Sequence, residues 1–303
     1  MVHLLRGVRF RVRTLTFRLP FTVLLLAVAC GAGFNTLRAS EERMSDMRIV
    51  FSGYVNYQPR WGSAIVRADG ISDVKDVRLL YPAGEISPDG RRIAYTTCSS
   101  WDRGIYIARI DGSGARLVPT TPGDYCVYAI RWSPDGKKVS YGSEMDYMLH
   151  LLDIETGVDR PMFATNLGGW GSWSPEGDEI VFENGRGGSR LLQIVDTTGR
   201  IRQLTYSKDF GECESWAPAW SPDGERIAFT ACSSLYTIKP DGTDVRRLTP
   251  RLPVYCPRWS VDGNWLLFLS NRTLERVRAD GGAPETLGVL PYRGGPFSLG
   301  PLR

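Results

Sequence analysis

The chain has 303 residues, enough for one large domain or two small ones, and its 33 glycines, 19 prolines and 9 tryptophans favour turn-rich β structure. Its formal net charge is +4, but residues 1–29 contain five arginines and no acidic residue. The remainder has 32 basic and 33 acidic residues. This balance excludes the basic surface typical of nucleic-acid-binding proteins, so we expect no nucleic-acid partner.

Residues 1–29 have the pattern of an export signal. The arginines precede the apolar stretch Leu19–Cys30, LPFTVLLLAVAC, as in a secretory signal. This stretch is shorter than the roughly 20 apolar residues that a membrane span needs. An uncleaved anchor reaching Leu37 is the alternative, and Cys30 after a small residue resembles a lipoprotein processing site. We expect an exported protein, periplasmic or extracellular, with membrane contact only through this segment. Whether it is cleaved, lipidated or anchored stays open. Residues 30–46 are expected to form a short linker.

A phrase of the form Ser-Pro-Asp-Gly recurs along the rest of the chain. It occupies residues 87–90, 133–136, 174–177 (as SPEG), 221–224 and 260–263 (as SVDG). Ser, Pro and Gly at these positions favour a type I turn. A short run rich in β-branched and aromatic residues follows each phrase and predicts a strand. A tryptophan stands directly before four of the phrases, and we expect it to pack between repeat units: Trp132, Trp173, Trp220 and Trp259.

A second series of turns has the same period. Its glycines, at residues 70, 112, 157, 199, 242 and 281, are 42, 45, 42, 43 and 39 residues apart. An apolar strand precedes each turn and, in most units, another strand follows it. The two series together predict four strands in each unit.

The sequence has six turns of the second series but five Ser-Pro-Asp-Gly turns, and this mismatch indicates a closed ring. The first unit begins directly with MRIVFSG at residues 47–53, without a leading strand. The C-terminal PFSLGPL, residues 296–302, lies about one period beyond the last phrase. The sequence therefore predicts an all-β, six-bladed β-propeller over residues 47–303, closed by the C-terminal strand. We expect it to be a monomer.

The segment Trp220–Thr249, WSPDGERIAFTACSSLYTIKPDGTDVRRLT, resembles the TolB-like β-propeller family, whose repeats are WD40-like. The resemblance covers roughly residues 47–303. It implies an exported propeller that binds another molecule, most often a protein. TolB carries an α/β domain before its propeller, for which residues 35–45 are too short, so a role in the Tol–Pal system does not carry over. The same repeat forms the gating propeller of prolyl oligopeptidase-like peptidases, but we expect no hydrolase domain in this chain.

Catalytic motifs are poorly represented. The nearest match to a G-x-S-x-G nucleophile elbow is Gly187–Arg190, which Leu191 follows. After residue 29 the sequence has one histidine, His150, within a strand-like run, where we expect a packed side chain. The Asp-Gly turns lack calcium-loop spacing. We therefore predict a non-enzymatic protein with no catalytic residues, metal or cofactor.

The cysteines indicate disulfides on one face of the ring. In this topology, the loops between second and third strands share a face with the loops between blades. Cys98 and Cys232 lie in loops of the first kind, and Cys126, Cys213 and Cys256 lie in the second. In an exported protein we expect the pairs Cys98–Cys126 and Cys232–Cys256. Cys213 is left over, with pairing to Cys232 as the alternative.

The same loop face collects aromatic and acidic residues, which we take as the candidate binding residues: Trp101, Asp124, Tyr125, Tyr128, Trp170, Glu212, Glu214 and Trp216. Such a mixture suits a protein or peptide partner. Packing of these rings across their own loops is the competing interpretation. We predict a protein-binding or scaffold module of the cell envelope. The alternatives are a hydrolase or lyase that uses the central pocket, and the sensor ectodomain of a membrane complex.

Overall fold

The computed structural model describes residues 47–54, 61–67, 75–79, 84–96, 104–120, 127–143, 145–164, 171–185, 190–260, 262–271, 273–289 and 297–301. The predicted signal or anchor segment, the linker and Cys30 lie outside these residues. Within the described segments, no helix is both long enough and apolar enough to cross a membrane.

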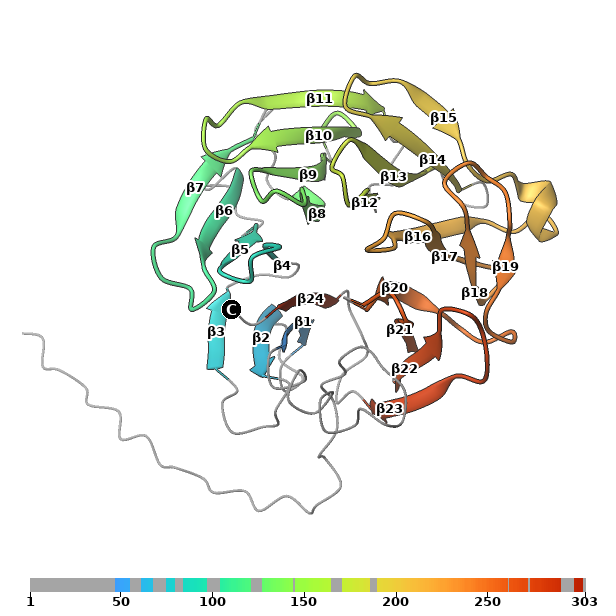
Figure 1. Cartoon of the computed structure of the whole chain (residues 1–303). Coiled ribbons are helices and arrows are strands. Elements are labelled where there is room, and N and C mark those ends of the chain that lie inside the picture. The colour runs from blue at the N-terminus through green and yellow to red at the C-terminus, as the bar shows by residue number, and fades with distance from the viewer. Residues whose placement is uncertain are drawn as a thin grey trace, which may run out of the picture.

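The strands form six four-stranded antiparallel sheets, arranged as blades around a central axis (Figure 1). We number the blades 1 to 6 in chain order and give the strands of each from the centre outward. Blade 1 contains β24 (Phe297–Pro301), β1 (Met47–Tyr54), β2 (Trp61–Arg67) and β3 (Lys75–Leu79). Blade 2 contains β4 (Glu85–Ile86), β5 (Arg92–Tyr95), β6 (Gly104–Arg109) and β7 (Arg116–Pro119). Blade 3 contains β8 (Val127–Trp132), β9 (Lys138–Ser143), β10 (Met148–Asp153) and β11 (Asp159–Ala164).

The remaining blades repeat this order. Blade 4 contains β12 (Gly171–Trp173), β13 (Glu179–Asn184), β14 (Leu191–Asp196) and β15 (Ile201–Gln203). Blade 5 contains β16 (Ser215–Trp220), β17 (Ile227–Ala231), β18 (Ser234–Ile238) and β19 (Arg246–Arg247), and a short 3-10 helix, η1 (Ser207–Phe210), precedes it. Blade 6 contains β20 (Tyr255–Trp259), β21 (Trp265–Ser270), β22 (Thr273–Arg278) and β23 (Glu285–Val289).

The C-terminal strand closes the ring as the sequence predicts. Strand β24 pairs antiparallel with β1, with Met47 opposite Pro301 and Phe51 opposite Phe297. The two ends of the described chain therefore share blade 1, and β24 supplies the innermost strand that the N-terminal unit lacks. This closure leaves each sheet with protected edges.

The repeated Ser-Pro-Asp-Gly phrase forms the turn between the first and second strands of a blade. In blade 5 the Gly224 N–H donates to Ser221 O (3.1 Å), and the Ser221 hydroxyl donates to Asp223 Oδ1 (2.6 Å). The blade 4 turn has glutamate in place of this aspartate, and the Ser174 hydroxyl donates to Asp178 instead (2.7 Å). The recurrence of the phrase thus reflects a turn that successive blades share.

Successive turns of this kind also touch one another. A β-carbon added at Gly224 would lie 3.3 Å from Pro175 Cγ, in the turn of the preceding blade. At Gly157, in an outer turn of blade 3, an added β-carbon would meet nothing within 4 Å. Both glycines have a left-handed φ, 77° and 73°. Both positions therefore require a left-handed backbone, but only Gly224 lies against a neighbouring blade.

We expect Gly224→Ala to lower the free energy of unfolding by about 2 kcal/mol and Gly157→Ala by about 1 kcal/mol, because both strain the backbone but only the first crowds a neighbouring blade. Urea denaturation of the two variants measures the difference. Equal losses would show that the contact between the turns contributes nothing to stability.

The tryptophans of the repeat join neighbouring blades. The indole N–H of Trp132 donates to Glu85 O (2.8 Å), and that of Trp259 donates to Ala219 O (2.9 Å). Each acceptor lies on the innermost strand of the preceding blade. The Trp220 indole differs, since it donates to Gly224 O in its own turn (3.1 Å). The expected inter-blade packing is thus observed, with one local variation.

Candidate functional site

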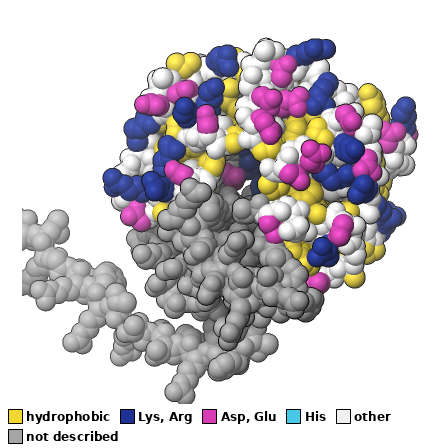
Figure 2. Space-filling view, viewed as in Figure 1, with side chains coloured by type: hydrophobic (Ala, Val, Ile, Leu, Met, Phe, Trp, Pro, Cys, Tyr) yellow, Lys and Arg dark blue, Asp and Glu magenta, His cyan; other side chains and the backbone are white. Residues whose placement is uncertain are grey.

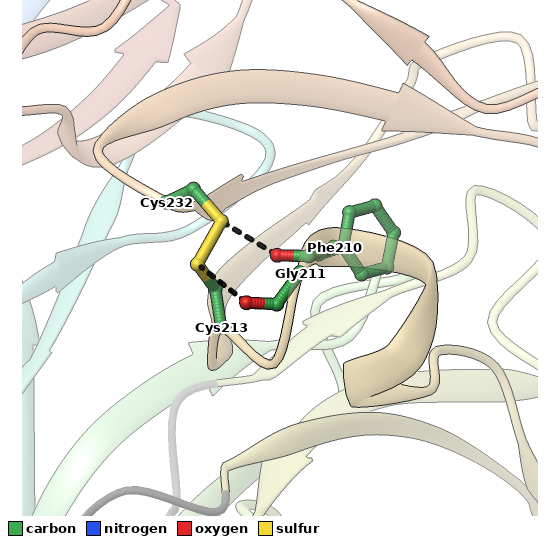
Figure 3. Close-up of a disulfide and its surroundings, with 4 residues drawn as sticks. All are labelled: Phe210, Gly211, Cys213 and Cys232. Atoms are coloured by element: carbon green, nitrogen blue, oxygen red, sulfur yellow. Dashed lines mark hydrogen bonds between the residues drawn. A yellow bond between two sulfur atoms is a disulfide. The ribbon is translucent and has the colours of Figure 1, made fainter.

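A disulfide between two described cysteines stabilises the loop face. Cys213 is bonded to Cys232, with 5.4 Å between their α-carbons (Figure 3). Cys232 and Ser233 form the two-residue turn between β17 and β18, both with left-handed φ values of 48° and 54°. Cys213 follows η1 in the loop that enters blade 5. The disulfide therefore joins this loop to the β17–β18 turn of the same blade.

The predicted Cys232–Cys256 pairing is wrong, and Cys256 is a free thiol. Cys256 lies within the innermost strand β20 rather than in the inter-blade loop. There burial raises the pKa of its thiol, while Arg258 and Arg131 act in the opposite direction. The alternative pairing of Cys213 with Cys232 is confirmed. Cys98 and Cys126 lie outside the described residues, so their pairing stays a prediction.

The disulfide also fixes an aromatic cluster beneath the loop. The Phe210 ring, at the end of η1, lies 5.4 Å from the rings of both Phe229 and Tyr236, edge to face. Cys232 Sγ lies 2.8 Å from Phe210 O (Figure 3). Phe210 and Phe229 are buried. The loop that carries Glu212 and Glu214 is therefore held against the core of blade 5.

Three of the predicted binding residues have described side chains: Glu212, Glu214 and Trp216. Tyr128 lies on β8, with its side chain outside the description, and the others also lie outside it: Trp101, Asp124, Tyr125 and Trp170. Glu212 is exposed, and its N–H donates to Ser207 O across the end of η1 (2.9 Å).

Glu214 and Trp216 belong to one cluster that we call the aromatic platform: Arg190, Glu214, Trp216 and Tyr255. Arg190 Nη2 donates to Glu214 Oε2 (3.0 Å), and the guanidinium lies 5.8 Å from the Trp216 ring centre. The Trp216 and Tyr255 rings are 5.6 Å apart. Tyr255 is 44% exposed although large and aromatic. The platform thus offers aromatic surface beside a bridged pair of opposite charges, a combination that suits protein recognition.

The innermost strands border a central hollow, which we call the channel, and acidic and basic side chains are visible in it (Figure 2). Three of these strands contain a β-bulge three residues before the repeat tryptophan. The bulge residues have left-handed φ values of 53°, 50° and 49°: Ala129, Ala217 and Cys256. Such bulges redirect neighbouring side chains and backbone groups.

Two arginines occupy equivalent positions on opposite blades, one residue before the tryptophan. Arg131 is on β8 of blade 3, and Arg258 is on β20 of blade 6. Arg131 Nε donates to Gly171 O (3.1 Å), and its Nη1 lies 3.4 Å from Glu85 Oε2. Burial lowers the pKa of Arg131 to about 10 and nearby Arg258 adds to this effect, whereas Glu85 opposes it. The two guanidinium groups thus repel each other within a partly desolvated channel.

Glu183, on β13, is a buried carboxyl near the same channel. Its Oε2 accepts the N–H of the bulge residue Ala217 (3.2 Å). Burial raises its pKa to about 7, although this hydrogen bond and Arg190 lower it, and Glu214 adds to the rise. Near neutral pH this carboxyl is therefore about half protonated.

The sequence interpretation missed Arg131, Arg258 and Tyr255. The two arginines share the position before the repeat tryptophan, in IRWSPDG and PRWSVDG. The residue directly before the tryptophan differs among the blades. A comparison of this position between the repeat units would have identified both arginines. Their closeness across the ring follows from the closed fold, which no local motif shows.

His150 belongs to a packed polar network in blade 3, as expected. Its Nε2 lies 3.0 Å from Asp146 Oδ2 and its Nδ1 lies 3.2 Å from Asp159 Oδ1. Tyr141 Oη donates to Asp159 Oδ2 (2.5 Å). Burial lowers the pKa of His150, but the two carboxylates outweigh it and the net shift is upward. In the described part of the chain, no three His, Cys, Asp or Glu residues come together as a metal site.

Three curated relatives share part of the chain. Uncharacterized protein Atu1656 of Agrobacterium fabrum is 27% identical over 53% of this chain and 54% of its own length. Uncharacterized peptidase YuxL of Bacillus subtilis is 25% identical over 55% of this chain and 31% of its own. The Tol-Pal system protein TolB of Acinetobacter baylyi is 32% identical over 26% of this chain and 18% of its own. The chain thus spans about half, or less, of the length of these relatives. No protein-family model matches it.

Solved structures resemble most of the chain. Putative TolB from Agrobacterium tumefaciens has a TM-score of 0.62 at 20% identity, covering 82% of this chain and 90% of the other. TolB from Acinetobacter baumannii has a TM-score of 0.55 at 19% identity, covering 80% and 69%. Oligogalacturonate lyase from Vibrio parahaemolyticus has a TM-score of 0.58 at 14% identity, covering 80% and 74%. The chain therefore has the TolB-like β-propeller fold.

Proposed function

We propose that this chain is a non-enzymatic, exported β-propeller of the cell envelope that binds a protein or peptide on its loop face. The TolB-like fold supports a binding or scaffold role. The Cys213–Cys232 disulfide supports an oxidising compartment, because such bonds persist outside the reducing cytosol. The proposed export route is the N-terminal segment of residues 1–29. Mass spectrometry of the mature N-terminus distinguishes cleaved, lipidated and anchored forms, and the anchored form would favour a sensor ectodomain.

The observation that carries this proposal is the aromatic platform. Trp216 and Tyr255 come from innermost strands of neighbouring blades, β16 and β20, and their rings adjoin. Aromatic and arginine side chains contribute most of the binding energy in many interfaces. Since η1 and its loop are held by the disulfide, the platform is preorganised and little ordering is needed when a partner binds.

We expect Trp216→Ala and Tyr255→Ala each to weaken partner capture from cell-envelope extracts by about 30-fold, the loss that corresponds to a binding hot spot. Trp265→Ala is the matched control. Trp265 follows the Ser-Val-Asp-Gly turn at the other end of blade 6, where it packs against Arg276 (4.2 Å). Equal capture by all three variants would contradict the loop face as the binding surface.

A lyase or hydrolase that uses the central channel is the second candidate. Glu183 supports it, since a carboxyl with a pKa of about 7 suits a general base. Incubation with oligogalacturonate, followed by absorbance of the unsaturated product, tests this candidate. We expect no product. Product formation by the intact chain that Glu183→Gln abolishes would establish an enzyme instead.

A further inference from the structure

Arg258 is a partly buried cation with an unusual environment. Its Nη1 donates to the neighbouring carbonyl of Pro257 (3.3 Å), while its Nη2 is buried. Within the described residues, three buried side-chain polar atoms lack a hydrogen-bond partner, and Arg258 Nη2 is the charged one among them. A buried donor of this kind is costly unless something accepts its hydrogen bond.

The charges around Arg258 do not balance it. Arg131 is close enough to raise the cost of a second positive charge, and Glu85 lies beside Arg131 (3.4 Å). Glu183 raises the pKa of the Cys256 thiol, and both arginines lower it. These groups therefore border one region of the channel. Among the described residues, no carboxylate forms an ion pair with Arg258, and its Nη2 has no hydrogen-bond acceptor. Such a site attracts an anion.

We propose that the channel binds a carboxylate group of the partner peptide, held by Arg258 with Arg131 facing it from the opposite blade. The planar guanidinium fork matches a carboxylate with two parallel hydrogen bonds. This inference rests on the proposed function, since the partner supplies the carboxylate. It deepens that function by naming the chemical group that is recognised.

The aromatic platform and the arginine pair are linked by one strand. Tyr255 and Arg258 lie on the same strand, β20, three residues apart. At about 3.3 Å per residue in a strand, this separation is about 10 Å. An extended peptide of three or four residues that packs on Trp216 and Tyr255 therefore reaches Arg258 with an acidic side chain or its C-terminal carboxylate.

The test uses the peptide Phe-Glu-Glu-Glu with a free C-terminus, against the amidated Phe-Gln-Gln-Gln and against free glutarate. We expect the acidic peptide to bind the intact chain with a Kd in the millimolar range or tighter, and the amide peptide and glutarate to bind at least about tenfold more weakly. Arg258→Gln should weaken acidic-peptide binding by at least about tenfold. The control Arg278→Gln, at an exposed position on β22 of the same blade, should bind as the parent does.

Unchanged binding by Arg258→Gln, equal binding of the amide peptide, or no binding of the acidic peptide would overturn the carboxylate site. Glutarate that binds as tightly as the peptide would overturn the peptide as the source of the carboxylate. We also expect the free energy of unfolding of Arg258→Gln to equal or exceed that of the parent, because an unpaired buried donor is removed. A lower value would indicate a structural arginine. Failure of the proposed function is separate: it would appear as partner capture that survives Trp216→Ala.

Discussion

Replacing both Cys213 and Cys232 with serine should lower the free energy of unfolding by about 3 kcal/mol. The disulfide closes a loop with a sequence separation of 19 residues, and the loss of loop-closure entropy in the unfolded chain accounts for a stabilisation of roughly that size. Urea denaturation of the oxidised parent and the double variant measures it. The variant should also weaken partner capture, because the loop with Glu214 would no longer be held against the core of blade 5.

The control is Cys256→Ser, which removes a free thiol and leaves the disulfide intact. We expect its free energy of unfolding to stay within about 1 kcal/mol of the parent. If Cys256→Ser destabilised the chain as much as the double variant does, the pairing of Cys213 with Cys232 would be contradicted. Non-reducing peptide mapping checks the same bond directly and also tests the predicted Cys98–Cys126 pair.

Glu183→Gln should change how stability depends on pH. The pKa of Glu183 is about 7 in the folded chain, against an ordinary value of 4.5, so the folded state holds more protons between these values. The free energy of unfolding of the parent therefore falls as the pH rises through this window, by roughly 3 kcal/mol from this group. Glutamine does not ionise and still accepts the Ala217 N–H, so the variant lacks this fall.

Urea denaturation at pH 4 and pH 8 tests this expectation. Relative to the parent, Glu183→Gln should gain about 3 kcal/mol of stability between the two pH values. Glu155→Gln, at an exposed position in blade 3, is the control and should follow the parent curve. Parallel curves for Glu183→Gln and the parent would show that this carboxyl ionises in the folded chain as it does in the unfolded chain.

The sequence predicts the ring because its determinants are local and repeated. Each Ser-Pro-Asp-Gly phrase forms its own turn, as Ser221 and Gly224 show. The C-terminal residues 297–301 lack the Ser-Pro-Asp-Gly phrase, yet β24 pairs with β1 over five residue pairs. A ring of blades requires this last strand, so counting turns identified it where residue similarity was low.

The contacts across the channel were not predicted because they depend on how the ring closes. Arg131 and Arg258 are far apart in the chain and meet only because blades 3 and 6 face each other. The cysteine pairing failed for a related reason. Spacing alone placed Cys256 in a loop, whereas a bulge in β20 keeps it inside the strand with a φ of 49°. The choice between Cys213 and Cys256 depended on these local backbone details.

The loop face around Tyr255 is the surface that we propose binds a peptide or protein. Photo-crosslinking tests it most directly, with a photoreactive phenylalanine analogue placed at position 255 or, as the control, at position 265. In intact cells that export the protein, position 255 should give a discrete protein adduct that Trp216→Ala removes, and position 265 should give none. No adduct at position 255, or the same adduct at both positions, would contradict the claim.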